Sequence, residues 1–598
     1  MSHITKLLLG ASLLVSPLSV QSAEPHTVPT ISALLDIDTP EAGQLVYVEG
    51  FHEPGDGAGG DFAYRLEREE PHDGGMIIDP GAPDPGEDIH AYLEWDGDPA
   101  AGHWFRMADD DSTINARWYG ARGDGNQNDQ VPLDRAKSYL SSREMRGVLH
   151  IPEGHYNVSL LRLSPGIDVR GDGISKTVLQ GPGTPTPLVR GGGEELNAEI
   201  TNLTFTKPEG DDWRLVRLRG VSHVAFRHVQ FRGGVVEFRD SSDIVIDHCV
   251  FTGKAGERGA YASSGVDNAT ITNNIVKNPM GGGFNLSGHT NSVAAGNLFI
   301  SDARIDTGYG GIRLPNGAMN NVVENNTIIG AGRGIFVLSG SEHNIVRDNR
   351  IAKTYQQGML IETPNNTIKR NIISDTWGTA IRVTDTGWNV PHNERITAEN
   401  ILLRDNVIVD TDVLDWDDVH RGRGLHIQGV ENRVLSNTVI SEYQRPLLYE
   451  TRSENMYENN TFSDHKVFEV TVKVAPDCIA EAVTFEGSQC DLTGLRHGGT
   501  TTPLDFRSQL PGLEFGEVST MHNSYTTLVK QGGAMELRLE AEDGVPEGYE
   551  FERWEALHED ELIADFTSLS INLEDVQGNY TLIAHYRPSE SGTASPAD

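Results

Sequence analysis

Two residues, Arg382 and His426, could carry out acid–base chemistry on an acidic substrate if the fold brings them together. Each is the middle residue of a short apolar–x–apolar segment, Ile381–Val383 or Leu425–Ile427. Neighbouring side chains of a β-strand point to opposite faces, so the middle residue points outward when its apolar neighbours are buried. An outward guanidinium can pair with a carboxylate or sulfate, and an imidazole can take a proton near neutral pH. The pair therefore indicates a site that binds an anion and abstracts a proton from it.

The equivalent segments of the chain predict a column of outward side chains along one sheet. We expect this column to hold Asn285, Arg313, Phe336, Leu360, Arg382, His426 and Leu448. The outward positions two residues further on include Glu362 and Gln428. Stacked strands are about 4.8 Å apart, so Arg382 and His426 should be neighbours along the stack if their strands are consecutive.

Three segments, 301–311, 384–395 and 410–423, are longer than the surrounding pattern requires. Repeat proteins carry insertions on their binding face, so we expect these segments beside the column. Aromatic rings stack on sugar faces and arginine pairs with acidic groups, which suits an extended acidic polymer. The candidate residues in these segments are Tyr309, Trp388, His392, Trp416 and Arg421. The acidic run 415–418 offers oxygen ligands for Ca²⁺, the one candidate cofactor.

The elements that must position these residues are the coils of a repeat over 197–462. A polar residue recurs, mostly at intervals of about 20 to 26 residues, and a large apolar residue usually follows two positions later. This pattern predicts a solenoid of β-strands, because one coil cannot bury its own apolar face and must stack on the next. Asparagine suits the stack because its amide both donates and accepts hydrogen bonds. The predicted inward positions are Asn202, His228, His248, Asn274, Asn297, Asn326, Asn349, Asn371, Asn406, Asn437 and Asn460.

Three segments before the repeat carry a resemblance to a known family. They are the loop WYGARGDGNQND at 118–129, an amphipathic stretch at 131–145 and the strand-like GVLHIPEGHY at 147–156. The middle stretch predicts a helix that covers the open edge of the first coil. Their order resembles the entry of pectate-lyase-like right-handed parallel β-helix proteins, and GDGAGGDFAY at 55–64 is similar to the lead-in of many members, including phage tail spikes.

The resemblance extends over roughly 44–462 and implies an all-β chain whose main domain is a right-handed, single-stranded parallel β-helix with a capping helix. The superfamily includes lyases, hydrolases, epimerases and non-catalytic members, so the resemblance implies no single reaction.

The chain of 598 residues is long enough for several domains. Residues 1–23 have the pattern of a secretory signal peptide, because the apolar run is too short to span a bilayer, and we expect a secreted or periplasmic protein. We then expect a small β module at 24–113, the β-helix catalytic domain at 114–475, a linker at 476–514, a β-sandwich-like module at 515–588 and a disordered tail at 589–598.

The C-terminal module is similar to small repeat modules of bacterial extracellular proteins. Cys478 and Cys490 are close enough to form a disulfide after export, whereas Cys249 should be buried and free.

The charge of the chain narrows the class of partner. A net charge of -39 argues against nucleic acid, and no segment after the leader predicts membrane insertion. We expect an acidic polysaccharide as the substrate, and the sequence is compatible with a monomer or a trimer.

The first functional hypothesis is a polysaccharide lyase that acts on a uronate-containing polymer of the alginate or pectate type. Elimination needs one group to neutralise the carboxylate, a base and an acid, which we assign to Arg382, His426 and Tyr309, with Arg313 on a neighbouring sugar. The alternatives are a glycoside hydrolase that uses Glu362 with Asp306 or a carboxylate of 415–418, a uronate C5-epimerase, and a non-catalytic glycan-binding protein or adhesin. The candidate catalytic residues are His426, Arg382, Tyr309 and Glu362, and the candidate substrate-binding residues are Arg313, Asn285, Trp388, His392, Trp416, Arg421 and Gln428.

Overall fold

The computed structural model describes residues 26–588 with internal gaps. The gaps are 67–69, 98–101, 144–145, 194, 209–213, 253–259, 279–281, 302–309, 386–387, 390–393, 411–422, 442–447, 451–453, 464–466, 475–494, 499–523, 531–534, 540–548, 559–560, 569 and 579. The predicted signal peptide, the C-terminal tail and the predicted Cys478–Cys490 disulfide therefore lie outside the described residues. The chain divides into two compact units between Asp109 and Asp110. None of the helices in the described part has the length and apolar character of a membrane span.

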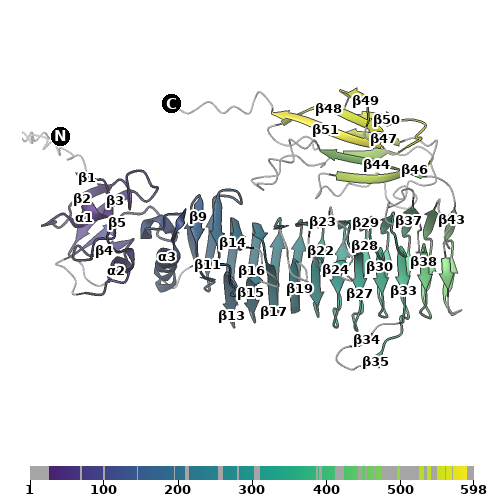
Figure 1. Ribbon diagram of the computed structural model, residues 1–598, viewed down its shortest axis with the longest axis horizontal. Helices are drawn as coiled ribbons and strands as arrows, with labels where there is room; N and C mark the ends of the chain where they lie inside the picture. Colours follow the sequence, from purple (N-terminus) through teal and green to yellow (C-terminus); the bar gives the residue numbers. More distant parts are fainter. Residues whose placement is uncertain are drawn as a thin grey trace, which may run out of the picture. The chain divides into compact units, whose positions relative to one another are not determined.

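The N-terminal unit is a five-stranded sheet with two short helices (Figure 1). Its strand order is β1 (His26–Val28), β2 (Leu45–Val48), β3 (Gly60–Arg65), β5 (His103–Arg106) and β4 (Ile77–Ile78), and its helices are α1 (Ile31–Leu35) and α2 (Ile89–Leu93). The Asp56 carboxylate organises the glycine-rich turn by accepting backbone hydrogen bonds from Phe51, His52 and Ala58 at 2.8–3.1 Å. Trp104 and Tyr92 are fully buried in the core.

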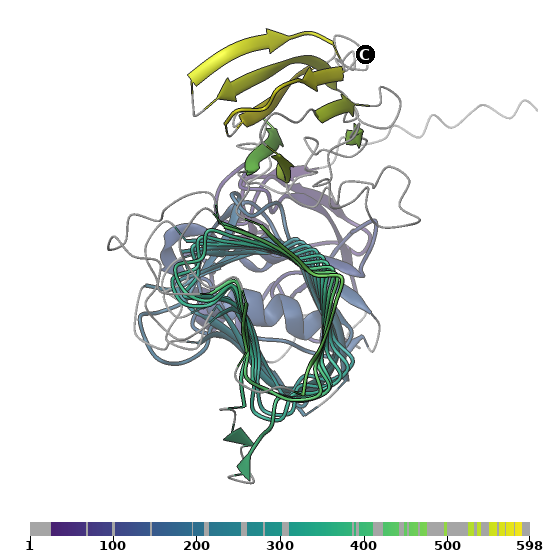
Figure 2. The same ribbon diagram turned by 90° about the vertical axis from the view of Figure 1, so that its right-hand side faces the viewer.

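The second unit contains a parallel β-solenoid in which each coil contributes strands to three stacked parallel sheets (Figures 1 and 2). Viewed along the axis, successive coils superimpose on one cross-section (Figure 2). Apolar residues alternate into the interior: Ile312, Ile335, Met359, Ile381 and Leu425 follow one another in register and are fully buried. The predicted all-β parallel β-helix is therefore confirmed.

The strands of the three sheets, named here sheet 1, sheet 2 and sheet 3, follow in coil order. Sheet 1 holds β10 (Leu161–Arg162), β13 (Val189–Gly192), β15 (Arg214–Arg219), the first part of β17 (Val235–Asp247) and of β19 (Tyr261–Thr272), β21 (Phe284–Ser287), β24 (Gly310–Leu314), β27 (Arg333–Val337), β30 (Met359–Ile361), β33 (Ile381–Val383), β38 (Leu425–Ile427) and β41 (Leu448–Glu450). Sheet 2 holds β6 (Thr113–Asn115), β8 (Gly147–Ile151), β11 (Ile167–Gly171), the first parts of β14 (Glu195–Thr206) and β16 (Ser222–Arg232), the second parts of β17 and β19, β22 (Val293–Ala295), β25 (Val322–Glu324), β28 (Ile345–Arg347), β31 (Thr367–Lys369), β36 (Leu402–Arg404), β39 (Arg433–Leu435) and β42 (Met456–Glu458). Sheet 3 holds β7 (Asp124–Asn128), β9 (Gly154–Asn157), β12 (Thr177–Gln180), the second parts of β14 and β16, β18 (Val250–Thr252), β20 (Ile275–Lys277), β23 (Leu298–Ile300), β26 (Thr327–Ile329), β29 (Arg350–Ala352), β32 (Ile372–Ser374), β37 (Val407–Asp410), β40 (Thr438–Ser441) and β43 (Thr461–Ser463).

The helix predicted before the first coils is α3 (Gln130–Ser142). Its buried face holds Leu133, Ala136, Tyr139 and Leu140, as the amphipathic pattern predicts. The helix contacts β6, β8 and β11 and the short 3-10 helix η1 (Ala116–Tyr119), so it packs on the first coils of the solenoid.

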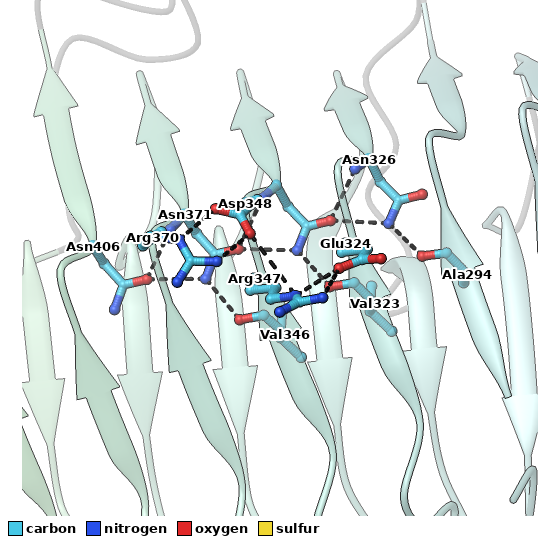
Figure 3. Close-up of polar contacts among 11 residues, drawn as sticks. Ala294, Val323, Glu324, Asn326, Val346, Arg347, Asp348, Arg370, Asn371 and Asn406 are labelled. Carbon is cyan, nitrogen blue, oxygen red and sulfur yellow. Dashed lines mark hydrogen bonds and ion pairs between the residues drawn. The ribbon is translucent and has the colours of Figure 1, made fainter. Parts of the chain in front are cut away.

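A ladder of buried asparagines joins the coils between sheets 2 and 3 (Figure 3). Asn326 shows the arrangement: its Nδ2 donates to the Ala294 carbonyl and to Asn349 Oδ1, both at 2.9 Å, and its Oδ1 accepts from the backbone and side chain of Asn297, both at 2.9 Å. Every polar atom of the amide is thereby satisfied in the dry interior, which offsets the cost of burying it. The ladder runs through Asn274, Asn297, Asn326, Asn349, Asn371, Asn406, Asn437 and Asn460.

The prediction of the ladder is wrong by one residue in the first three coils. Asn202, His228 and His248 have positive φ angles of 57°, 51° and 51°, and the rings of the two histidines stack on each other at 5.2 Å, with the His248 side chain 37% exposed. The ladder position beside Asn274 is held by Cys249, whose backbone N–H donates to Asn274 Oδ1 at 2.9 Å. Cys249 is buried and free, as predicted, and burial raises the pKa of its thiol to about 12.

The described C-terminal strands form two small sheets. The larger has the order β46 (Ser524–Lys530), β44 (Val467–Val474), β51 (Tyr580–Pro588), β48 (Tyr549–His558) and β49 (Glu561–Phe566), and the smaller joins β45 (Leu495–Gly498), β47 (Met535–Leu539) and β50 (Ser570–Leu573). The segment β44, which the sequence analysis places in the β-helix domain, pairs instead with β46 and β51. The solenoid strands thus end at β43, and Trp554 is fully buried among the C-terminal strands.

Candidate functional site

The outer face of sheet 1 aligns a continuous column of side chains. The register runs Asn285, Arg313, Phe336, Leu360, Arg382, His426 and Tyr449, with each residue directly opposite the next. Arg382 on β33 and His426 on β38 are therefore direct cross-strand neighbours, as the strand pattern predicts. Side chains in such positions are close enough to act on one bound group.

The last member of the column is Tyr449, whereas the sequence analysis expects Leu448. Leu448 pairs with Leu425 on the inward side of the register, and the Tyr449 ring lies 5.0 Å from the His426 ring in an edge-on arrangement. The three residues 447–449 are all apolar or aromatic, so alternation alone does not distinguish their faces. The shift replaces an aliphatic side chain at the site with a phenol.

His426 is held as a neutral imidazole. Its side chain is buried, with 8% of the residue exposed, and its Nε2 atom is buried without a hydrogen-bond partner. Burial, together with the positive charges of Arg382 and Arg423, lowers the pKa of His426 to about 4. At neutral pH the ring therefore carries no charge and retains a nitrogen lone pair that can accept a proton.

Four arginines surround this part of sheet 1: Arg313, Arg333, Arg382 and Arg423. Burial lowers the pKa of the Arg333 guanidinium, the charge of Glu362 opposes that effect, and the charges of Arg313 and Arg382 add to it. The guanidinium carbons of Arg313 and Arg333 lie 5.6 and 4.9 Å from the centre of the Phe336 ring, and the Arg423 guanidinium lies 4.0 Å from that of Tyr449. The rings of Phe336 and Tyr449 thus make cation–π contacts with these arginines.

Two of these guanidiniums have no acidic partner of their own. Neither Arg382 nor Arg423 forms an ion pair with a residue that the structure describes, and the Nε atom of each is buried without a hydrogen-bond partner. Sheet 2 is different: there Arg347 binds Glu324, and in the turns directly after its strands Arg370 binds Asp348 at 2.6 Å (Figure 3). Partly buried cations without a counter-ion are costly, particularly in a chain of net charge -39, and mark a place where an external anion is expected.

Glu362 and Gln428 occupy one row beside the column, as predicted. The backbone ladder places Glu362, Thr384 and Gln428 on successive coils, each N–H donating to a carbonyl of the preceding coil. Thr384 donates its hydroxyl proton to Gln428 Oε1 at 2.6 Å, which fixes the amide orientation. The negative charge of Glu362 raises the pKa of Arg333 and so partly offsets the effect of burial.

An aromatic stack lies at the turns that lead into sheet 1. The rings of Tyr355 and Trp377 are 5.0 Å apart and 13° from parallel, and their residues precede β30 and β33. Sequence reasoning missed this stack, although its spacing equals one coil. It also missed Arg333 and Arg423, which share the pattern Arg-Gly-apolar. Arg333 is the first residue of β27, and Arg423 lies two residues before β38.

Several predicted site residues lie outside the described residues: Tyr309, His392, Trp416, Arg421 and the acidic run 415–418. Trp388 is described only by its backbone, as part of the short hairpin β34 (Trp388–Asn389) and β35 (Glu394–Arg395) that follows β33 (Figure 1). Among the residues that the structure does describe, no group of three or more histidine, cysteine, aspartate or glutamate side chains is arranged to hold a metal ion. The predicted Ca²⁺ site remains a prediction.

Comparisons with known families agree with this architecture. Residues 294–407 match the model of the right-handed beta helix region, and residues 27–118 match that of the phage tail protein small four-stranded beta-sheet domain. The segment that matches the β-helix model includes β33, which carries Arg382. No curated protein matches the chain.

Solved structures with a similar fold have low sequence identity to this chain. The A-module of the Azotobacter vinelandii mannuronan C-5 epimerase AlgE4 is 19% identical, with a TM-score of 0.41, over 58% of this chain and 95% of that one. The Thermotoga maritima exopolygalacturonase is 11% identical, with a TM-score of 0.38, over 59% and 92%. The Dettilon tailspike protein is 12% identical, with a TM-score of 0.44, over 78% and 94%. These similarities concern the fold.

Proposed function

We propose that this protein is an exported polysaccharide lyase that cleaves an acidic, uronate-containing polymer by β-elimination on the outer face of sheet 1. The observation that supports this most strongly is a neutral, buried His426 in direct register with Arg382 and beside Arg423. Elimination next to a carboxylate needs this combination, because the cations stabilise the charge that develops as the proton leaves.

In the proposed reaction, Arg382 and Arg423 bind the uronate carboxylate and make the adjacent C5–H bond more acidic. His426 accepts the C5 proton, the electron pair forms the C4–C5 double bond, and the bond from C4 to the glycosidic oxygen breaks. The leaving oxygen takes a proton from Tyr309, the predicted acid, or from Tyr449, whose ring packs against His426. Arg313 binds an acidic sugar further along the column, three strand steps or about 14 Å from Arg382.

Substrate binding strengthens the base in this arrangement. The charges of Arg382 and Arg423 contribute to the low pKa of free His426. A bound carboxylate neutralises those charges, so the pKa of His426 rises when the substrate is in place. The imidazole is thus neutral before binding and more basic afterwards.

The test is incubation with alginate, polygalacturonate, glycosaminoglycans and sulfated algal glycans, with absorbance followed at about 235 nm for the new double bond. The variants Arg382→Ala and His426→Ala are expected to lose activity at least about 100-fold. Arg404→Ala is a matched control, because Arg404 lies on sheet 2 in the same coil as Arg382, in an exposed ion pair with Asp405 at 3.1 Å that contributes little stability.

Other outcomes would reject elimination in distinct ways. New reducing ends without absorbance, and products heavier by one water than the unsaturated ones, would indicate a hydrolase, for which Glu362 is the candidate acid. Exchange of the C5 proton with solvent at constant chain length would indicate an epimerase. Binding without any product would indicate a glycan-binding protein or adhesin.

A further inference from the structure

The column that holds Arg382 continues towards the N-terminus and contains a second group of arginines. Arg162 on β10 pairs with Arg190 on β13, Arg190 with Arg217 on β15, and Arg217 with Glu237 on β17. The column then passes through β19 to Asn285 and Arg313. Arg217 and Arg382 are seven strand steps apart, or about 34 Å along the axis.

This N-terminal arginine group has far more positive than negative charge. β10, β13, β15 and the segment 235–239 of β17 contain six arginines and one glutamate, and no other charged residue. Glu237 is 4% exposed and binds Arg217 and Arg214 at 2.9 Å and Arg239 as well. In the described part of the chain, Arg162, Arg190 and Arg219 form no ion pair, and the Nε atom of Arg190 is buried without a hydrogen-bond partner.

The pairing of these arginines is unfavourable for an unliganded sheet. Arg162 lies opposite Arg190, Arg190 opposite Arg217, and like charges directly opposite each other destabilise a sheet. Sheet 2 shows the stabilising alternative, since Glu324 lies opposite Arg347 and forms an ion pair with it. A row of like charges repeated at the strand spacing fits a ligand that itself carries repeated anionic groups.

We propose that the N-terminal arginine group is a second, non-catalytic binding site for an acidic polysaccharide, whose carboxylate or sulfate groups bind Arg162, Arg190 and Arg219. The site lies on the same face as His426, so one long polymer can occupy both sites and gain affinity by multivalency. The identity of the ligand as an acidic glycan rests on the proposed function, whereas binding at this site is measured separately from cleavage.

The experiment compares the double variant Arg190→Gln/Arg219→Gln with the wild type. Both residues lack a carboxylate partner in the described chain, so the substitutions leave no buried anion behind. Affinity is measured by calorimetry for polygalacturonate, alginate and heparin, each as long chains and as short oligosaccharides. The expected result is an affinity for at least one long acidic polymer that is weaker by about tenfold or more, with unchanged affinity for and turnover of short oligosaccharides. Arg404→Gln/Arg433→Gln, two exposed residues of sheet 2, is the control and should bind like the wild type.

Three results would overturn the proposal. One is unchanged affinity for every long polymer in a double variant whose melting temperature equals that of the wild type. The second is an equal loss for long and short ligands, which would place the effect at the His426 site. The third is binding of double-stranded DNA as tight as that of the polysaccharides, because the site would then not select a glycan. If no polymer is cleaved at all but the double variant still loses affinity for the long chains, the proposed reaction fails and this site stands.

Discussion

At the scale of single residues, His426 links the electrostatics of the site to a measurable pH dependence. Its pKa of about 4 lies below the usual value near 6.5, because the ring is buried beside Arg382 and Arg423. As the proposed base, His426 must be neutral, so kcat/KM, which reports the free enzyme, should rise with pH through about 4 and be level above it. Because a bound carboxylate neutralises the arginines, the corresponding rise of kcat should occur at higher pH.

The variant Arg423→Gln tests the cause of that shift. Removing one nearby cation raises the pKa of His426, so the acid limb of kcat/KM should move to higher pH while His426 is still present. The measurement is the pH profile of the initial elimination rate between about pH 3.5 and 8 at low substrate concentration. A limb that stays where it is in the wild type would show that the charge of Arg423 does not contribute to the low pKa of His426. The control Arg404→Gln should leave the profile unchanged.

At the scale of elements, the asparagine ladder holds each coil in register with the next. The stability that each asparagine contributes should depend on how deeply its side chain is buried. Asn349 accepts from Asn326 N and Nδ2 at 3.0 and 2.9 Å and donates to the Val323 carbonyl and Asn371 Oδ1 at 2.9 Å. Asn349→Ala leaves these groups unsatisfied in the interior, at about 1–3 kcal/mol each before relaxation. We expect a loss of several kcal/mol, on the order of 3, in the stability of the solenoid.

Asn460 in the last described coil provides the comparison. It makes the same type of contact, accepting from Asn437 Nδ2 at 3.0 Å, but it is only partly buried. Water can replace its hydrogen bonds, so Asn460→Ala should cost about 1 kcal/mol or less. Denaturant unfolding followed by far-ultraviolet circular dichroism measures both. Equal losses for the two variants would show that the ladder does not act through buried hydrogen bonds.

The asparagine ladder shows that the sequence predicts the period of the coils well, whereas the position of the ladder residue within a coil is ambiguous. The period of Asn297, Asn326 and Asn349 predicts the coils, the register of Arg382 with His426 and the row of Glu362. A left-handed residue stands directly before the ladder residue in many coils, as at Asn273 and Asn325, with φ angles of 60° and 54°. Asparagine and histidine suit that position as well as an inward one, so the first three coils are predicted one residue out of place.

The candidate site is predicted less completely than the fold, because it depends on residues outside the apolar alternation. Arg333 is the first residue of β27 and Arg423 precedes β38, so neither is the middle residue of an apolar–x–apolar segment. The Tyr355–Trp377 stack lies in turns, where no two-residue period identifies an outward face. Tyr449 follows two apolar residues, so its face becomes clear only from its pairing with His426. Sequence periodicity therefore locates the sheet that carries the site but not the residues at its edges.

At the scale of the whole molecule, the net charge of the chain opposes the binding of the acidic polymer that we propose as the ligand of the sheet 1 arginines. The net charge is -39, so an acidic polymer is repelled at long range and attracted only near those arginines. The two effects have different ranges. The Debye length falls from about 30 Å at 0.01 M salt to about 8 Å at 0.15 M, which screens the distant repulsion but much less the direct contacts with arginine.

This difference predicts a salt optimum for polymer turnover. From about 10 mM to about 150 mM salt, KM for a long acidic polymer should fall several-fold, and towards about 1 M it should rise as the arginine contacts are screened. Because the proposed chemistry is local to His426, kcat should change little over the same range. Initial rates measured across salt concentrations test this, with the shortest cleaved oligosaccharide as a comparison, since its smaller charge is repelled less and its KM should depend less on salt. A KM that increases steadily from the lowest salt would show that attraction dominates at every distance, and the long-range repulsion inferred from the net charge would then play no part in substrate capture.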